Sequence, residues 1–285
     1  MESQLPDNLR RGRTTDGNSV VLKLVKSREL EIHSFLNSVK SKDNHTIPIL
    51  HTIALSTGPI IVMPDQLVLT YVASSVFETS GDNLASQFIA GVRFMHQQNV
   101  AHLDLKPDNI LVTPTTTNPR LQICDFDVSV RVAGLDSWIT GYRGTQGWAA
   151  PEVTEDLSQR YQPIRADLWS TGRVTEYIDK RHPAHTSCVL KALFNRLLTH
   201  DPLKRPLLSE IYLPHEGRPE RMNPPIRPIV SGLDGAPDPR SSSRLKESRL
   251  QLKRRLGVDG KEKEVVKRMR KSVQPGSRLV SHRVV

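Results

Sequence analysis

Four polar residues that could do chemistry lie within one short stretch, VAHLDLKPDNILV (100–112). It holds two aspartates, a lysine and an asparagine, and it ends in an apolar run. A second stretch, ICDFDVSV (123–130), brings Asp125 at the end of another apolar run. Loops beside buried segments are where a rigid scaffold presents polar groups to a cleft. The spacing predicts that the two stretches meet at one site.

Phosphoryl transfer is the chemistry that these residue types support. The reaction requires a carboxylate that binds the acceptor hydroxyl, oxygen ligands for a metal ion, and cations that bind the phosphates. Asp104, Lys106, Asn109 and Asp125 supply all three. An aspartate near a lysine in a loop is far more often a solvated turn than a catalytic base, so the assignment depends on the surrounding motifs.

The elements that must position these residues follow from changes in periodicity. A β-rich run at 19–25 follows the turn signal TTDGN, and a second, buried strand is predicted at 59–64. A helix is predicted over 27–39, with Ser27 as N-cap candidate, and an amphipathic helix over 82–99. The predicted apolar stripe of the first helix holds Leu30, Phe35, Leu36 and Val39. Strands come first and helices later, which is typical of an α+β fold.

Composition limits the class of protein. With 285 residues, 37% of them apolar, the chain can bury a real core. No apolar run approaches the roughly 20 residues needed to span a bilayer, and the first residues lack the apolar region of a signal peptide. Only two cysteines occur, Cys124 and Cys188, which we expect to be buried thiols. These features predict a soluble, intracellular protein that makes no contact with a membrane.

The positive charge is concentrated at the C-terminal end. From His215 onward there are 18 Lys and Arg against 8 Asp and Glu, which accounts for the whole net charge of +10. This part is rich in Pro, Gly and Ser and lacks apolar periodicity, so we predict a disordered tail over 214–285. The clusters KRR (253–255) and KRMRK (267–271) resemble a two-part nuclear import signal or are simply solvated. The expected compartment is therefore cytoplasm, nucleus or both, and contact with a polyanion through the tail is a further possibility.

The motif order resembles that of eukaryotic protein kinases. His-x-Asp-x-Lys-x-x-Asn at 102–109 is similar to their catalytic loop, and DFD (125–127) to their metal-binding motif. GTQGWAAPE (144–152) resembles the end of an activation segment, ADLWSTG (166–172) the start of a central buried helix, and LLTHDPLKRP (197–206) the last helical turns of the fold. Phrases such as DNHTIPIL and YQPIRADLWS look like a group of fungal kinase-like proteins.

The resemblance implies a role for each matching position. Asp104 would accept the proton of the substrate hydroxyl, and Lys106 would hold the γ-phosphate. Asn109 and Asp125 would bind Mg²⁺. The remaining nucleotide contacts implied are Lys23 on the α- and β-phosphates, Glu31 as its partner with Glu29 as the alternative, Val21 and Leu111 against adenine, and Met63 and Asp65 beside the base.

The resemblance also implies three structural contacts and a substrate class. His102 would support the metal motif, Glu152 would pair with Arg205, and Asp167 would cap the backbone of the catalytic loop. Lys106 and Thr145 stand where serine/threonine kinases, rather than tyrosine kinases, have these residues.

Two departures from the family pattern bear on activity. Residues 1–19 contain only Gly12 and Gly17, so the Gly-x-Gly-x-x-Gly loop that covers the phosphates is missing. Either the gene model is truncated or the chain binds nucleotide poorly. In addition, Asp127 replaces the glycine of the metal motif and adds a negative charge near the metal.

The sequence therefore predicts a two-lobed, protein kinase-like α+β fold with a reduced N-terminal lobe. Its parts are a truncated segment at 1–18, a kinase domain at 19–213 and the basic tail. The predicted function is ATP- and Mg²⁺-dependent phosphorylation of serine or threonine in protein substrates. The alternative is a pseudokinase that serves as a binding or scaffold module. Oligomeric state does not follow from the sequence.

Overall fold

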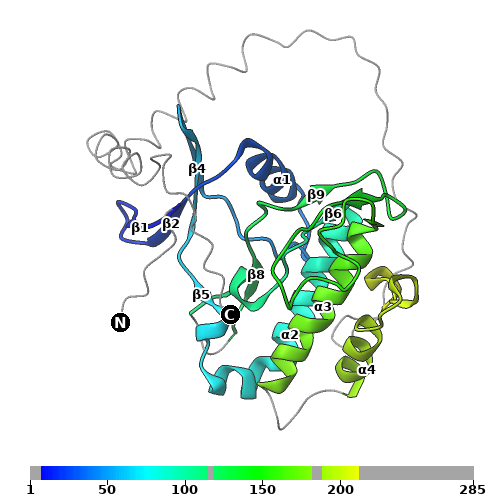
Figure 1. Ribbon diagram of the computed structural model, residues 1–285. Helices are drawn as coiled ribbons and strands as arrows, with labels where there is room; N and C mark the ends of the chain where they lie inside the picture. Colours follow the sequence, from blue (N-terminus) through cyan, green and yellow to red (C-terminus); the bar gives the residue numbers. More distant parts are fainter. Residues whose placement is uncertain (1–7, 115–117, 182–187, 212–285) are drawn as a thin grey trace, which may run out of the picture. The chain divides into compact units, whose positions relative to one another are not determined.

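The computed structural model of the protein (Figure 1) describes residues 8–114, 118–181 and 188–211. These residues divide at Lys23 into two compact units, which we describe one at a time. The predicted domain end near Leu213 and the whole predicted tail lie outside the described residues.

The first unit is a β-hairpin. Strand β1 (Leu9–Arg13) pairs antiparallel with β2 (Ser19–Leu24), from Leu9 opposite Lys23 to Arg13 opposite Ser19. The turn signal at 14–18 is confirmed, because the Gly17 N–H donates to the Thr14 carbonyl at 3.0 Å. Gly17 has φ +82°, which favours glycine. The first strand thus comes from residues that we predicted to be a separate N-terminal segment.

The second unit opens with a helix and a β-hairpin. Helix α1 (Ser27–Ser38) is followed by β3 (His51–Leu55) and β4 (Gly58–Pro64), which pair antiparallel. The helix and the buried strand are confirmed, but one detail of α1 was wrong. Ser27 is the first helical residue rather than the N-cap. The buried residues are Glu29, Ile32, His33 and Leu36, so of the predicted stripe Leu36 is confirmed as buried, while Leu30, Phe35 and Val39 are partly buried against the core. Hydrophobic periodicity misses the polar side chains of this buried face.

The rest of the second unit is mainly helical. Helix α2 (Ser74–Gln97) begins eight residues before the predicted helix and ends two before it, with Asn99 in the left-handed region at φ +56°. Helices α3 (Pro163–Lys180) and α4 (Cys188–Leu197) complete the set of α-helices in the described chain. The short strands are β5 (Leu67–Val68), β6 (Val100–Ala101), β7 (Ile110–Val112), β8 (Leu121–Ile123), β9 (Val130–Arg131), β10 (Ile139–Thr140) and β11 (Arg160–Tyr161). The 3₁₀ turns are η1 (Leu69–Tyr71), η2 (Pro107–Asn109), η3 (Pro202–Lys204) and η4 (Leu208–Glu210).

The core of this unit lies where α2 and α3 run side by side, with α4 packed beside α3 (Figure 1). Phe77, Leu84 and Phe88 of α2 are fully buried there, as are Leu168 and Val174 of α3. The same core includes residues of β7 and β8, so the loops that carry the polar residues are attached directly to it.

The two cysteines do not lie where we expected. Cys124 is half-buried and Cys188 is exposed at the start of α4. Among the described residues there is no helix with both the length and the apolar character needed to cross a membrane.

Candidate functional site

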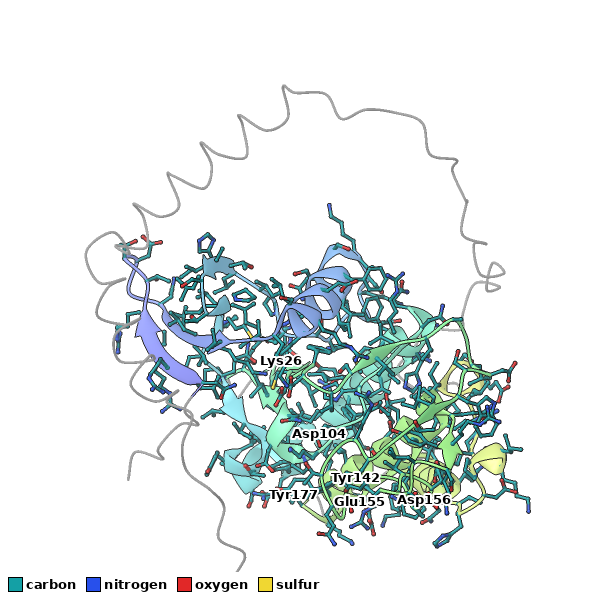
Figure 2. The ribbon with its side chains drawn as sticks, turned by 45° about the horizontal axis from the view of Figure 1, so that its top comes forward. Lys26, Asp104, Tyr142, Glu155, Asp156 and Tyr177 are labelled. Atoms are coloured by element: carbon teal, nitrogen blue, oxygen red, sulfur yellow. The ribbon has the colours of Figure 1, made fainter. Side chains whose placement is uncertain are left out.

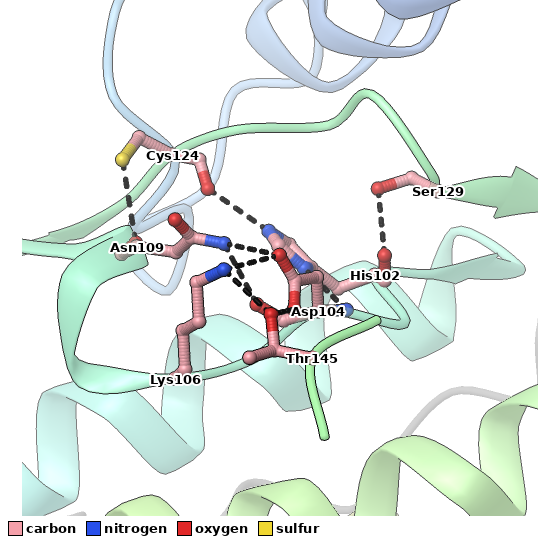
Figure 3. Close-up of polar contacts among 7 residues, drawn as sticks. All are labelled: His102, Asp104, Lys106, Asn109, Cys124, Ser129 and Thr145. Atoms are coloured by element: carbon pink, nitrogen blue, oxygen red, sulfur yellow. Dashed lines mark hydrogen bonds and ion pairs between the residues drawn. The ribbon is translucent and has the colours of Figure 1, made fainter. Parts of the chain in front are cut away.

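The predicted catalytic residues converge on Asp104, in the loop between β6 and β7 (Figure 3). Lys106 Nζ donates to one carboxylate oxygen at 2.8 Å, and the Asn109 amide donates to the same oxygen at 3.0 Å and to the Asp104 carbonyl at 2.8 Å. The Thr145 hydroxyl donates to the other carboxylate oxygen at 2.7 Å. The carboxylate is therefore held on both oxygens by cationic or neutral donors.

Thr145 also ties the lysine in place. Lys106 Nζ donates to Thr145 Oγ1 at 2.7 Å, so Asp104, Lys106 and Thr145 form a closed triangle of hydrogen bonds. The side chains of Asp104 and Lys106 retain 14% and 19% exposure. The cation is thus partly shielded yet still open to a phosphate.

Close backbone approach brings Thr145 to this site, and Gly144 makes it possible. Gly144 has φ +102°, and a Cβ built on it would lie 2.4 Å from the carbonyl oxygen of Leu103. Real Cβ atoms do not approach a backbone oxygen so closely, so a larger residue must displace either the catalytic loop or the segment at 144–145.

We expect Gly144→Ala to lower phosphoryl transfer by about a hundredfold, because a displacement of about 1 Å at a reacting group has an effect of that size. The measurement is kcat, with circular dichroism as the check on folding. Gly147→Ala is the matched control, since Gly147 also has positive φ (+84°) but no atom lies within 4 Å of its built Cβ. Equal losses in the two variants would mean that backbone strain, not the contact with Leu103, causes the defect.

Asp167 fixes the backbone of the catalytic loop through hydrogen bonds. This side chain is fully buried on α3, and its carboxylate accepts from the N–H of His102 at 2.6 Å and of Leu103 at 2.7 Å. His96 Nε2 lies 3.1 Å from the same carboxylate. The predicted capping role of Asp167 is confirmed. It holds Leu103 at φ +66°, a conformation that few non-glycine residues adopt.

The metal motif is attached to the catalytic loop by two contacts. The Cys124 N–H donates to the Asn109 carbonyl at 3.0 Å, and His102 Nε2 lies 3.0 Å from the Cys124 carbonyl. The fully buried Phe126 ring lies 5.2 Å from the His102 ring, which confirms that His102 supports this motif. Asp125, between Cys124 and Phe126, has φ +71°. The predicted metal ligands Asn109 and Asp125 are thereby brought to one place.

The oxygen atoms of Asn109 and Asp125 suit a magnesium ion whose remaining ligands are phosphate oxygens and waters. Because the Asn109 amide nitrogen is committed to Asp104, its amide oxygen points away from Asp104 (Figure 3). No cluster of three or more His, Cys, Asp or Glu suited to a metal occurs in the described part of the chain. Mg²⁺ commonly takes one or two protein oxygens and completes its shell with waters and substrate phosphates. Asn109 and Asp125 match that requirement.

The residues predicted beside adenine are only partly brought together. Met63, at the end of β4, is buried in an apolar cluster against which Leu111 of β7 and Cys124 pack. Asp65 directly follows β4. Val21 and Lys23 lie on β2 in the first unit, so their contacts with nucleotide stay predictions.

Burial distinguishes Glu31 from Glu29, the two residues considered as partner of the lysine predicted to bind phosphate. Glu31 is exposed to solvent, whereas Glu29 is 2% exposed. A separation of two residues turns side chains to opposite sides of a helix, so only one of them can face the core. Burial therefore favours the alternative, Glu29, and the pairing itself stays a prediction.

The predicted ion pair between Glu152 and Arg205 is confirmed. Arg205 is 1% exposed and forms a two-pronged ion pair with Glu152, at 2.6 and 2.8 Å. It also donates to the carbonyls of Thr199, Arg165 and His200. This arginine uses all five of its donors to hold residues 152, 165 and 199–200 together.

Tyr142 is a site neighbour that sequence reasoning missed. Burial raises the pKa of its hydroxyl, and the negative charges of Asp104 and Glu155 raise it further. Figure 2 shows Tyr142 between these two residues. The residue is 39% exposed and lies two positions before Gly144, which approaches the backbone of Leu103. No motif in the sequence distinguished it from an ordinary loop tyrosine.

Residues 61–188, which include Asp104, Lys106, Asn109, Asp125 and Thr145, match the family described as "Protein kinase domain". This part of the chain is similar to the eukaryotic protein kinase superfamily. The observed α+β architecture, with antiparallel strands followed by helices, is consistent with the fold of that family.

The kinase domain is similar to several curated kinases over short segments. It is 39% identical over 97 residues to the probable serine/threonine-protein kinase KKQ8 of Candida glabrata, covering 33% of this chain and 12% of the relative. It is 36% identical over 104 residues to the serine/threonine-protein kinase HAL5 of the same yeast, covering 35% and 12%. It is also 32% identical over 127 residues to a probable myosin light chain kinase of Dictyostelium discoideum, covering 45% and 35%.

Proposed function

We propose that the protein transfers the γ-phosphate of ATP to serine or threonine residues of protein substrates. The observation that carries the proposal is the triangle of hydrogen bonds among Asp104, Lys106 and Thr145. It combines a carboxylate that can receive a proton with a cation that can hold a phosphate. The comparisons name kinases only, and they give no support to the pseudokinase alternative.

Asp104 is the residue proposed to act on the acceptor. Its carboxylate takes the proton of the substrate hydroxyl as the hydroxyl oxygen forms its bond to phosphorus. Lys106, 2.8 Å from that carboxylate, holds the phosphate oxygens beside it. Thr145 keeps both side chains in one geometry, which is the positioning on which phosphoryl transfer depends.

ATP with Mg²⁺ supplies the phosphoryl group and neutralises charge that develops on it. Asn109 and Asp125 are the residues proposed to hold the ion, and Lys23 the residue proposed on the α- and β-phosphates. Val21, Leu111 and Met63 would line the adenine, with the backbone at Asp65 beside it. Glu29, in place of Glu31, would orient Lys23.

Serine and threonine are the proposed acceptors. Lys106 and Thr145 occupy the positions typical of serine/threonine kinases, and Thr145 bonds both catalytic side chains. The direct test is incubation of the full-length protein with labelled ATP, Mg²⁺ and a serine-rich protein, followed by phosphoamino-acid analysis. Label on serine or threonine is expected, and label on tyrosine alone would contradict the proposed acceptor class.

We expect activity to be independent of phosphorylation in the segment between the metal motif and Thr145. Leu103 precedes the catalytic aspartate and cannot bind a phosphate. It is buried in an apolar cluster with Val130, Tyr161 and Ile164. Apolar packing thus holds this segment where other kinases rely on a phosphate and an arginine.

The test replaces Ser137 and Thr140 together by alanine. Transfer should stay within about twofold of the unchanged protein, because neither side chain supports the apolar cluster and surface substitutions have small effects. Loss of transfer in a folded double variant would contradict this expectation.

Two proposals on the basic tail follow from its sequence. Its charge suits a polyanion, and its two basic clusters suit nuclear import. Fluorescence microscopy of the tagged full-length protein tests import, because replacing Lys253, Arg254 and Arg255 by alanine should move it out of the nucleus. An unchanged distribution would reject import by this signal.

A further inference from the structure

Asp127 is the residue of the metal motif that departs from the family pattern, and the structure gives it a partner. Lys26 Nζ lies 2.8 Å from one carboxylate oxygen of Asp127 and 3.2 Å from the other. Lys26 directly precedes the first residue of α1, and Asp127 comes two residues after the candidate metal ligand Asp125. The pair therefore joins the start of a helix to the metal motif across 101 residues of sequence.

The backbone at Asp127 supports a fixed arrangement of this motif. Among the described residues other than glycine, only Asn99, Leu103 and Asp125 have positive φ, so Asp127 lies in the ordinary region. A glycine at this position would have access to positive φ as well. Aspartate thus removes alternative backbone conformations while its side chain adds a contact.

Two more side-chain pairs connect α1 to the same segment. The Phe126 ring lies 4.8 Å from the His33 ring, and the Arg131 guanidinium lies 3.9 Å from the centre of the Phe35 ring. Together with the ion pair, these contacts reach α1 at its start, its middle and its last turn. The buried Glu29 lies between the first and second of them.

We propose that Asp127 is a positioning residue, whose ion pair with Lys26 holds the first turn of α1, and with it Glu29, in fixed relation to the segment that carries Asp125. The inference rests on the proposed function, since positioning matters only if nucleotide is bound there. Lys26 also balances the extra negative charge that Asp127 adds near the metal. The side chains are 77% and 40% exposed, so solvent screens the pair and its effect is moderate.

The test is a charge-swap cycle in the full-length protein: Lys26→Glu, Asp127→Lys and both together. Each single variant should lower kcat/KM for Mg–ATP by about two- to fivefold, the range that corresponds to an exposed ion pair. Without nucleotide, hydrogen exchange at the amides of residues 29–33 should speed up by a similar factor. The double variant should recover both quantities to within about twofold. Lys180→Glu is the matched control, because Lys180 forms a 2.8 Å pair with Glu176 away from this segment and should leave kcat/KM unchanged.

The outcomes separate this inference from the proposed function. Absence of transfer in the unchanged protein would reject the proposed function, while the exchange measurement would still test the contact. If Asp127→Lys impairs binding of Mg–ATP but Lys26→Glu does not, Asp127 acts on the metal directly and the positioning role is rejected. Additive losses with no recovery in the double variant would also overturn it.

Discussion

Asp104→Asn is expected to abolish phosphoryl transfer, with kcat falling by about 10²- to 10⁴-fold, the usual contribution of a general base. Asparagine has nearly the same shape, and its amide oxygen can still accept from Lys106, which now reaches one carboxylate oxygen at 2.8 Å. Its amide NH2 would take the place of the oxygen that accepts from Thr145 at 2.7 Å and would donate to that hydroxyl instead. Asparagine cannot take up the proton of the acceptor hydroxyl. The measurement is kcat with a serine-rich protein, alongside the thermal midpoint of unfolding, which should change little.

Asp108→Asn, the same substitution four residues later, is the control for Asp104→Asn. Asp108 belongs to the same loop but is exposed, and the structure places it outside the triangle around Asp104. Asp108→Asn should leave kcat within about twofold, as surface substitutions usually do. Transfer by Asp104→Asn at the rate of the unchanged protein would show that another group accepts the proton.

Arg205→Leu should destabilise the domain by about 3–5 kcal/mol, the usual result of removing one partner of a buried ion pair. The change leaves the Glu152 carboxylate without its 2.6 and 2.8 Å partners, and three backbone carbonyls lose a donor. Leucine fills part of the space but supplies none of these bonds. Urea unfolding followed by tryptophan fluorescence measures the effect.

Lys204→Ala is the comparison for Arg205→Leu, since Lys204 is the neighbouring cation in the chain. It is 74% exposed and its pair with Asp201 spans 3.7 Å. Its loss should cost less than about 1 kcal/mol, the usual limit for an exposed pair. Similar effects of the two substitutions would mean that the five bonds of Arg205 contribute little beyond charge.

The contacts around the catalytic loop were predictable because the motifs resemble those of protein kinases. The sequence placed Asp104, Lys106, Asn109 and Asp125 in two loops beside buried strands, and the structure joins those loops through Cys124. The ion pair of Glu152 and Arg205 was likewise implied by the resemblance rather than by any local property of the sequence.

Features that depend on polar burial escaped prediction. The inner face of α1 also buries Glu29 and His33, which hydrophobic periodicity does not detect, and Glu31 was preferred because Ile32 follows it. The pair of Lys26 and Asp127 is distant in sequence and largely exposed, and neither residue belongs to a charge pattern that marks it. Tertiary contacts between polar groups leave no periodic trace in a sequence.

The most direct test of the proposed nucleotide site is calorimetric titration of the full-length protein with ATP, with and without Mg²⁺. Asn109 and Asp125 both present oxygen ligands, so ATP should bind more tightly with Mg²⁺ than without it. At a hundredfold excess over Kd, Mg–ATP should also stabilise the fold by about 2.7 kcal/mol. In Asp125→Asn the benefit of Mg²⁺ should largely disappear. Equal affinity with and without the ion, or no binding of ATP at all, would contradict the account.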